Sequence, residues 1–423
     1  ELFRDGRERL RRRLPEKAIA ILVSADEMPR SADQTYPYRP NPDLFRLCGI
    51  DQEETILVIC PEAHQIHHRE ILFIRESNPE IATWEGHKLT KEEARAISGI
   101  DTVYWTSEFE QVCHELIIRS EFIFLALNEN IRARTQVPGA EQRFAWRIRE
   151  KYPLHQYGRL GPIMDEIRAI KHPAEVDVIR KACQITGQAF ERVLRFVRPG
   201  VREYEVEAEI IHEFIRLGAQ GHAYQPIIAS GPNACVLHYN ANSAVCEDGH
   251  LLLLDFGAEY AHYASDLTRT IPVNGRFTPR QKAVYEAVLR VMNHAKTLLR
   301  PGTLYSEYEK EVGACMTEEL IGLGLLNKEE IARQDPQKPL YKKYYMHGTS
   351  HFLGLDVHDS GNRDFPMAAG MIFTCEPGIY IPEEGLGIRL ENDILLTDHG
   401  PVDLMAHISL LPDDIEKAML GNA

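Results

Sequence analysis

Two largely apolar segments of the chain carry pairs of acidic residues in their interiors, and these pairs restrict how the segments can fold. The segment LLLLDFGAEYAHYASDLTRTIPV contains Asp255 and Asp266, and the segment MIFTCEPGIYIPEEGLGIRLENDILLT contains Glu376 and Glu391. Apolar runs of this kind, bounded by turn residues, predict antiparallel strands. A carboxylate in such a strand is costly unless a cation compensates its charge.

The expected hairpins bring the two acids of each segment together. If the first segment folds back about Tyr260 and Ala261, Asp255 lies opposite Asp266 on the same face of the sheet. The same fold-back at the Glu-Glu-Gly turn of the second segment places Glu376 near Glu391. Carboxylates opposed within about 5 Å are destabilising unless a cation lies between them. The two pairs therefore predict a site for divalent metal ions.

A histidine-rich segment, HGTSHFLGLDVHD, lies between the two acid pairs in the sequence and runs from His347 to Asp359. Four carboxylates and one imidazole from this segment are enough to hold two divalent cations. Each element also has an ordinary interpretation, in which the acids lie at exposed strand ends and His351 is a hydrogen-bonded core histidine. The combination of three such segments favours the metal site.

Length, charge and cysteine content exclude several other classes of protein. A chain of 423 residues exceeds one usual core, so we expect two domains. The formal net charge of −15 argues against binding to nucleic acid or to an anionic membrane surface, and no apolar stretch is long enough to span a membrane. The eight cysteines are scattered without a CxxC pair, which favours free thiols in the cytoplasm. Cys375, beside Glu376, is better explained as a core thiol than as a nucleophile.

The pattern of elements divides the chain near residue 158. Residues 1–158 alternate strand candidates such as AIAILVSA and FIFLALN with helical segments such as KEEARAISG, which predicts a small α/β domain. Residues 159–423 contain two similar passages of helices followed by acid-bearing strands. This repeat predicts an α+β domain of pseudo-twofold symmetry, with the metal site at the centre of a curved antiparallel sheet.

These motifs give the chain a clear resemblance to a known family. VLHYN, LLLLDFGAEYAHYASDLTRTIPVNGRFT, HGTSHFLGLDVHD, CEPGIY and GIRLEND resemble the aminopeptidase P and prolidase family over nearly the whole chain. The resemblance implies a creatinase-like α/β domain at 1–158, followed in the sequence by a pita-bread catalytic domain at 159–423. It also implies two metal ions per subunit, usually manganese. The matching ligand positions are Asp255, Asp266, His351, Glu376 and Glu391.

The resemblance further implies which ligands hold each of the two cations. Asp266 and Glu391 are expected to bridge the two cations, Asp255 to complete one, and His351 and Glu376 to complete the other. Glu376 is also expected to accept the proton of the attacking water. All five ligands are present, which disfavours a metal-free relative.

Further positions match residues around the substrate in that family. His238 and His358 match histidines that steady the tetrahedral intermediate or the substrate, and His347 matches one on the proline side. Arg389 matches an arginine that orients groups near the site, although a supporting salt bridge explains it equally well. Tyr380 is expected either to donate a hydrogen bond or to pack.

The expected activity is release of the N-terminal residue from small peptides with proline in the second position. The segments YPYRPNPDLFRLCGI and TWEGHKLT resemble aminopeptidase P, where residues matching Asp43 and Trp84 reach a neighbouring subunit's active site in a homo-oligomer. A capped turn and a packed aromatic are the alternatives for these two residues. The alternative functions are a prolidase that cleaves Xaa-Pro dipeptides and a non-catalytic pita-bread binding protein. Arg363 is given no role, because the segment around it looks short for the family.

Overall fold

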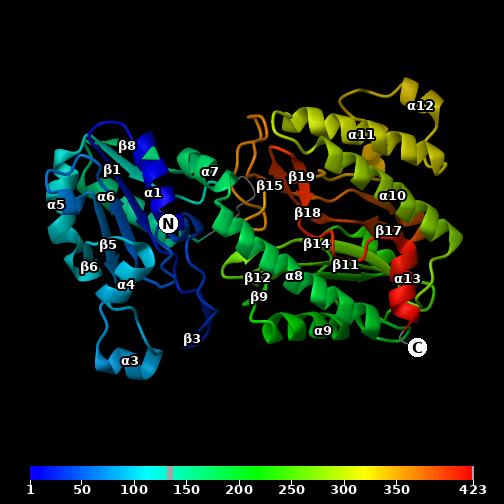
Figure 1. The fold of residues 1–423 in the computed structure, drawn as a ribbon, viewed down its shortest axis with the longest axis horizontal. Coiled ribbons are helices and arrows are strands. Elements are labelled where there is room, and N and C mark those ends of the chain that lie inside the picture. Colours follow the sequence, from blue (N-terminus) through cyan, green and yellow to red (C-terminus); the bar gives the residue numbers. More distant parts are fainter. Residues whose placement is uncertain (131–136, 422–423) are drawn as a thin grey trace. The chain divides into compact units, whose positions relative to one another are not determined.

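The computed structural model describes residues 1–130 and 137–421, and they form two compact units, Glu1–Arg168 and Ala169–Ala423 (Figure 1). The expected boundary after residue 158 falls inside β8 (Gln156–Arg159), which pairs with β7 (Phe122–Leu125) in the sheet of the first unit. The residues that follow β8 form α7 (Gly161–Ala169). Pairing of β8 extends the first unit beyond the expected boundary.

The first unit is a mixed six-stranded sheet with helices on both faces. Its strands run in the order β6-β5-β4-β1-β7-β8, with β1 antiparallel to β4 and parallel to β7. The strands not yet bounded are β1 (Ala18–Val23), β2 (Pro29–Ser31), β3 (Gln34–Thr35), β4 (Ile56–Ile59), β5 (Glu70–Ile74) and β6 (Val103–Trp105). The remaining helices are α1 (Leu2–Arg13), α2 (Pro42–Cys48), α3 (Pro79–Glu85), α4 (Lys91–Ser98), α5 (Phe109–Arg119) and α6 (Ala140–Lys151).

Every residue of β1 is buried, because apolar clusters cover both faces of the sheet. Residues of α1, α2, α4 and α7 pack against one face, and residues of α5 and α6 pack against the other. The helix starts follow from their caps: Thr90 and Glu93 form a capping box at the start of α4. This sandwich confirms the α/β class expected for the first part of the chain.

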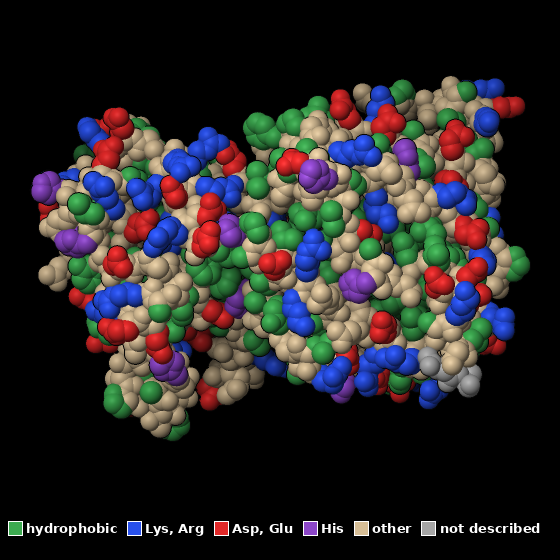
Figure 2. All heavy atoms as spheres, in the orientation of Figure 1, with side chains coloured by type: hydrophobic (Ala, Val, Ile, Leu, Met, Phe, Trp, Pro, Cys, Tyr) green, Lys and Arg blue, Asp and Glu red, His purple; other side chains and the backbone are tan. Residues whose placement is uncertain are grey.

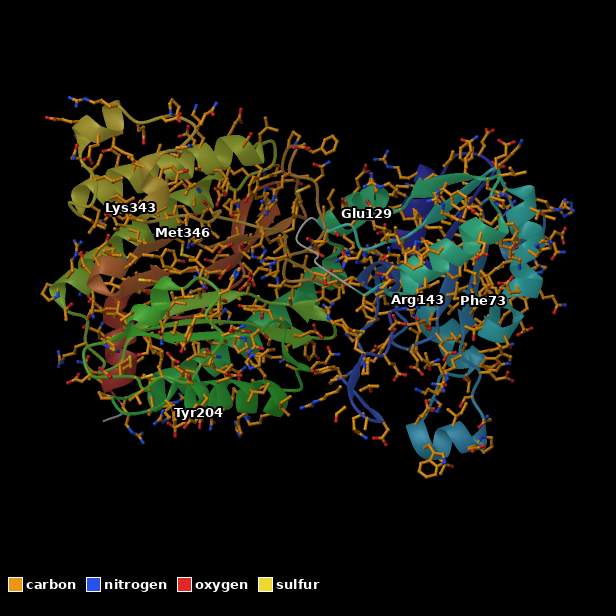
Figure 3. All side chains as sticks on the ribbon, turned by 180° about the vertical axis from the view of Figure 1, so that it is seen from behind. Phe73, Glu129, Arg143, Tyr204, Lys343 and Met346 are labelled. Atoms are coloured by element: carbon orange, nitrogen blue, oxygen red, sulfur yellow. The ribbon has the colours of Figure 1, made fainter. Side chains whose placement is uncertain are left out.

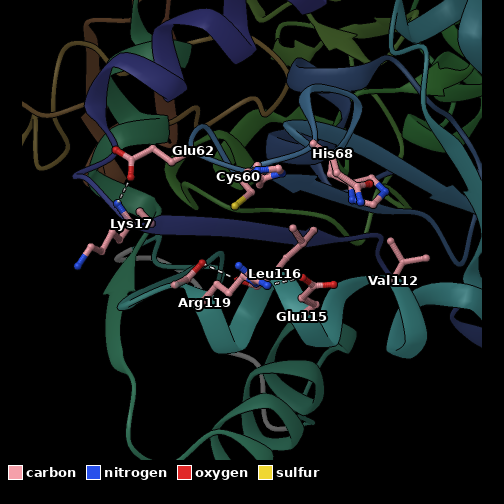
Figure 4. Close-up of a pocket in the computed structure, with 13 residues that line it drawn as sticks. Lys17, Cys60, Glu62, His68, Val112, Glu115, Leu116 and Arg119 are labelled. Atoms are coloured by element: carbon pink, nitrogen blue, oxygen red, sulfur yellow. Dashed lines mark hydrogen bonds and ion pairs between the residues drawn. The ribbon is translucent and has the colours of Figure 1, made fainter.

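A hollow of about 510 Å³ in the first unit lies between the loop after β4 and helix α5 (Figure 4). Two of its charged groups pair with each other: the Arg119 guanidinium lies 2.9 Å from a carboxylate oxygen of Glu115. The Lys17 ammonium pairs instead with Glu121, which lies outside the lining, and the backbone N–H of Lys17 donates to Glu62 over 3.1 Å.

The second unit consists of antiparallel strands between two helix pairs, α8 with α9 and α10 with α11 (Figure 1). Its helices are α8 (Pro173–Phe196), α9 (Glu203–Arg216), α10 (Pro279–Leu298), α11 (Tyr305–Gly322), α12 (Lys328–Ala332) and α13 (Pro412–Leu420). Its strands are β9 (Gly221–His222), β10 (Ile227–Ser230), β11 (Leu251–Phe256), β12 (Ala258–Tyr260), β13 (Tyr263–Ala264), β14 (Leu267–Pro272), β15 (Ile372–Cys375), β16 (Gly378–Ile381), β17 (Leu386–Arg389), β18 (Asn392–Thr397) and β19 (Gly400–Asp403).

The strands of the second unit form four small sheets that meet around the acidic residues. Their orders are β10-β11-β14, β13-β12-β9, β15-β18-β19 and β16-β17. A backbone bridge between Thr268 and Glu391 joins the strands of the earlier passage to those of the later one. Each passage contributes a helix pair and acid-bearing strands, as the repeated pattern in the sequence predicts.

The first acid-bearing hairpin has a register that differs from the expected one. Asp255 pairs with Thr268 rather than with Asp266, because the turn lies at Ala261 and His262, whose φ angles are 48° and 67°. The expected pairing of Asp255 with Asp266 is therefore wrong, because the partner of Asp255 lies two residues further along the chain. A shift of two keeps side chains on the same face of a sheet, so Asp266 remains beside Asp255.

The second acid-bearing hairpin has the register that its sequence predicts. One continuous register runs through both strand pairs, with Cys375 opposite Asn392 and Gly378 opposite Arg389. This register places Glu376 opposite Glu391. The turn is formed by a short 3-10 helix, Pro382–Glu384, and by Gly385 at a φ of 59°.

The surface carries charges of both signs. Figure 2 shows lysine and arginine side chains interspersed with aspartate and glutamate over the visible face. No described helix is both long and apolar enough to cross a membrane.

Candidate metal centre

The first acid pair surrounds the hydroxyl of a tyrosine that sequence analysis did not single out. Asp255 and Asp266 are both buried, and the Tyr224 hydroxyl lies 2.6 Å from Oδ1 of Asp255 and within hydrogen-bond distance of Oδ1 of Asp266. A single hydroxyl can donate to one carboxylate at a time. Burial, reinforced by the two aspartates, raises the pKa of Tyr224 well above its usual value. Tyr224 therefore stays protonated between the two acids.

Three buried side chains from distant parts of the unit converge next to this pair. Ligand atoms of Asp266, His351 and Glu391 all lie within 4.8 Å of one another. Nε2 of His351 lies 3.4 Å from Oδ2 of Asp266 and 3.7 Å from Oε1 of Glu376. This spacing brings four of the five expected ligands to one place, and Asp255 adjoins them through Tyr224.

The hydrogen bonding of His351 leaves the correct nitrogen for a metal. Nδ1 of its ring lies 2.9 Å from the carbonyl oxygen of Phe352 and can donate a proton to it. That bond favours the tautomer in which Nε2 carries a lone pair, and Nε2 is the atom that faces the carboxylates. The backbone N–H of His351 donates to Thr374, which fixes the segment in place.

The pKa is raised for three carboxylates of the centre, those of Asp266, Glu376 and Glu391. Burial is the main cause: it raises the pKa of Asp266 and Glu391 well above their usual values, and that of Glu376 to about 7. The neighbouring carboxylates add to this effect, because like charges at short range disfavour ionisation. A cluster that holds protons in this way is electrostatically prepared for cations, which would displace those protons.

Arg389 connects the centre to its surroundings and is buried. Its guanidinium forms an ion pair with Asp255 and donates to the Thr268 hydroxyl over 3.1 Å and to the Tyr380 hydroxyl over 2.8 Å. The Thr268 hydroxyl in turn donates to Oε2 of Glu391 over 2.6 Å. The arrangement contains the supporting salt bridge that was one of the two interpretations of Arg389.

His347 lies at the edge of the centre as a neutral ring. Its Nε2 can accept from the Tyr380 hydroxyl at 2.8 Å, and its Nδ1 can donate to the carbonyl of Gly348 at 2.8 Å. Burial lowers the pKa of His347 to about 3, with a further contribution from Arg389. Tyr380 thus forms a hydrogen-bonded link between Arg389 and His347. Met346, the preceding residue, is exposed (Figure 3).

The other two expected histidines lie close to this group. The ring of His358 stands edge-on to that of His351, with centroids 4.4 Å apart. His238 is exposed, in the segment that follows the 3-10 helix Gly231–Cys235, and it contributes to the lowered pKa of His347. The structure therefore brings His238, His347 and His358 to the rim of the acidic cluster.

The two candidates of the first unit differ in their surroundings. Oδ1 of Asp43 accepts a hydrogen bond of 2.8 Å from Arg168, and Asp43 lies in the first turn of α2, which Asn41 caps. The Trp84 side chain, on α3, is 83% exposed, so the alternative of a packed aromatic is wrong for this residue. Arg363, in the second unit, lies over the ring of Tyr305 at 4.4 Å.

A buried cluster of carboxylates and one imidazole in a curved antiparallel sheet defines a metallohydrolase-type centre. Residues 177–398 match the model of metallopeptidase family M24, and residues 3–124 match that of the aminopeptidase P N-terminal domain. The chain belongs to metallopeptidase family M24. This result confirms the resemblance inferred from the motifs and the pita-bread fold expected for the second unit.

Relatives with the same architecture match over nearly their full length. The chain is 36% identical to the Xaa-Pro aminopeptidase of Escherichia coli, covering 99% of this chain and 97% of that protein. It is 30% identical to human Xaa-Pro aminopeptidase 3, covering 94% and 80%.

Solved structures show the same correspondence. Pseudomonas aeruginosa aminopeptidase PepP superposes with a TM-score of 0.90 at 33% identity, covering 99% of this chain and 98% of that chain. Zinc-substituted E. coli aminopeptidase P in complex with product superposes with a TM-score of 0.88 at 34% identity, covering 100% and 98%.

Proposed function

We propose that the protein is an Xaa-Pro aminopeptidase that uses two divalent metal ions per subunit to release the N-terminal residue from peptides with proline in second position. The observation that carries this proposal is the convergence of Asp266, His351 and Glu391, with Asp255 and Glu376 beside them, in a chain that matches Xaa-Pro aminopeptidases from end to end.

The donor set fits hard divalent cations. Four carboxylates and one imidazole nitrogen offer mainly oxygen ligands, which suit manganese better than a thiolate set would. Asp266 and Glu391, which come from opposite halves of the unit and lie together in the cluster, would each be shared by both ions, as the family resemblance implies. Asp255 would complete one site, and His351 with Glu376 the other.

The chemistry supplied by such ions is the lowered pKa of a shared water and polarisation of the scissile carbonyl. Glu376 is the residue that we assign to accept the proton of the attacking water, as the family resemblance implies; its Oε1 lies 3.7 Å from Nε2 of His351, beside the other expected ligands. His238 and His358, at the rim, would steady the oxygen that becomes negatively charged in the tetrahedral intermediate.

Proline specificity calls for groups that do not rely on an amide proton. The bond before proline is a tertiary amide, so it offers no N–H to an ordinary peptidase cleft. We assign His347 to the proline side, where Tyr380 and Arg389 hold it neutral and oriented. Arg389 acts in this proposal through Tyr380 and Asp255 rather than by contact with the peptide.

The test is hydrolysis by manganese-loaded protein of an Xaa-Pro-Yaa tripeptide, with an Xaa-Pro dipeptide as the parallel substrate. Release of the first residue from the tripeptide alone supports the proposal, and cleavage of the dipeptide alone would make the protein a prolidase. Cleavage of neither substrate, with bound metal verified, would indicate the non-catalytic binding protein. Zinc-loaded and cobalt-loaded samples run in parallel would test the assignment of manganese.

We also propose a cytoplasmic homo-oligomer, a dimer or a tetramer, in which the exposed Trp84 contacts a second copy of the chain and, with Asp43, approaches its substrate. The Trp84 side chain is 83% exposed, so its ring is accessible for contact with a second copy. Light scattering of wild type and Trp84→Ala tests this: a smaller assembly in the variant supports the contact, and an unchanged mass contradicts it.

A further inference from the structure

Glu203, the first residue of α9, is a buried carboxylate with four hydrogen-bond donors. Its Oε1 accepts from the backbone N–H of Ser230 at 2.8 Å and from the Asn233 amide at 3.2 Å. Its Oε2 accepts from the Tyr239 hydroxyl at 2.8 Å and from the backbone N–H of Ala244 at 2.8 Å. The residue is 0% exposed, whereas its neighbour Tyr204 is 51% exposed. Figure 3 labels Tyr204 on α9.

The four donors explain how this carboxylate tolerates burial. Among the described residues, no lysine or arginine forms an ion pair with Glu203. A buried carboxylate is expensive unless its lone pairs are satisfied, and hydrogen bonds to an ionised acceptor are stronger than neutral ones. The position at the start of α9 adds the favourable field of the helix N-terminus. Glu203 thus connects four separate residues of the chain to the start of α9 by hydrogen bonds.

The segment that Glu203 holds is the one that carries His238. The contacts at Asn233 and Tyr239 lie on either side of His238 in the sequence, and the contact at Ala244 holds the far end of the same segment. His238 itself is exposed. The His238 side chain, which is expected to meet the substrate, therefore belongs to a segment that is held by hydrogen bonds to Glu203.

The opposite side of this segment packs against the strands of the metal centre. A Cβ atom at Gly387, on β17, would lie 2.3 Å from the carbonyl oxygen of Ala234, so the two backbones are in close contact there. Ala234 also packs in one apolar cluster with Tyr380, which hydrogen-bonds to His347. The segment is held between Glu203 on one side and the residues of the centre on the other.

From these contacts we propose that Glu203 is a positioning residue of the proposed reaction, which sets the place of His238 relative to the metal centre. The inference rests on the proposed function for its catalytic readout. Glu203 touches neither the metal ligands nor the space above them, and it acts through the segment between Ser230 and Ala244. A carboxylate suits this task because each of its oxygens accepts two hydrogen bonds at once.

The test is a double-mutant cycle of Glu203→Gln and His238→Ala in the metal-loaded protein. Glutamine keeps the shape of the side chain but presents an N–H₂ group to donors. We expect Glu203→Gln to lower kcat about tenfold to a hundredfold, since small displacements of a catalytic group have effects of this size. Bound metal should stay at the wild-type level. In the His238→Ala background, Glu203→Gln should lower kcat by less than about twofold, because the residue that it positions is already absent.

Glu175→Gln is the matched control. Glu175 is a buried glutamate in the first turn of α8 that accepts hydrogen bonds from the Tyr263 hydroxyl at 3.0 Å and from the backbone N–H of His172 at 2.8 Å. Its effect on kcat should be the same in both backgrounds. The positioning role is overturned if Glu203→Gln lowers kcat by the same factor in the wild-type and His238→Ala backgrounds. It is also overturned if Glu203→Gln leaves kcat unchanged. If Glu203→Gln does not fold, Tyr239→Phe removes one of the four donors and replaces it in the same cycle.

A second readout does not depend on turnover. In protein with ¹³C-labelled histidine, the ring signal of His238 is identified by its loss in His238→Ala. The proposal expects this signal to shift or broaden in Glu203→Gln and to stay unchanged in Glu175→Gln. An unchanged signal in Glu203→Gln overturns the inference. A shifted signal in a protein that cleaves no Xaa-Pro peptide would refute the proposed function and leave the positioning of His238 standing.

Discussion

Lys171 and Asp359 form an ion pair in the interior of the second unit, and Lys171→Met should destabilise the protein strongly. Nζ of Lys171 lies 2.8 Å from Oδ2 of Asp359, and each side chain is 1% exposed. Removal of one partner of a buried ion pair is strongly destabilising and typically costs about 3–5 kcal/mol. Asp359 follows His358 directly, so the turn that carries this histidine should also loosen.

The packing around the pair supports the upper part of that range. A Cβ atom at Gly354 would lie 2.2 Å from the Asp359 carboxylate and 2.9 Å from Cε of Lys171, so the pair is closely packed on that side. The backbone of the pair is also engaged: the N–H of Lys171 donates to Gly370 over 2.9 Å, and that of Asp359 donates to Phe352 over 3.0 Å. The charged partner left behind therefore has little freedom to reach solvent.

Urea unfolding at constant metal concentration measures the loss. Lys171→Met should lower the free energy of unfolding by about 3–5 kcal/mol, and the double variant with Asp359→Leu should recover most of it, because no unpaired charge remains. Arg12→Met is the surface control: its pair with Glu8 has side-chain exposures of 73% and 54%, and its loss should cost less than about 1 kcal/mol. A similar small loss for Lys171→Met, or a double variant that equals the sum of the single ones, would refute the reasoning.

Three further changes test the centre itself. Burial raises the pKa of Glu376 to about 7, and this carboxyl must lose its proton when cations bind. Metal affinity measured by calorimetry should therefore rise from about pH 6 to about pH 8. An affinity that does not change over this pH range contradicts the reasoning. Glu376→Ala should lower kcat at least about 100-fold while circular dichroism stays native, and near-wild-type turnover would exclude its assigned role. Gly257→Ala places a Cβ atom 1.7 Å from the carbonyl oxygen of Ser265, so it should cost about 1–3 kcal/mol or more and reduce bound metal measured by mass spectrometry. Gly322→Ala, where a Cβ atom meets nothing within 4 Å, is its control, and equal effects of the two changes would show that the close approach is unimportant.

Side-chain alternation made the acid pairs predictable. Acids in apolar strands required a common face, and the register of β16 with β17 gave Glu376 opposite Glu391 as expected. The first hairpin was predicted on the correct face but two residues out of register. Its turn uses Ala261 and His262 at positive φ, and neither is a residue type that marks a turn in sequence.

Residues that meet the centre through tertiary structure could not be predicted. Tyr224 lies in a connection between two short strands, and Glu203 begins a helix; neither belongs to an acid-bearing strand or to the histidine segment. Their roles depend on which segments pack beside them, and local pattern does not encode that. The same reason explains the domain boundary, since the pairing of β8 with β7 joins residues from separate parts of the chain.

The bridge between Thr268 and Glu391 has a consequence for the order of events during folding. Each half of the second unit supplies only part of the ligand set, and the parts meet where this bridge closes. A partly folded chain with one half formed would therefore lack a complete binding site. Tight retention of the cations should begin only when both halves have docked, so metal uptake marks the completion of the native state.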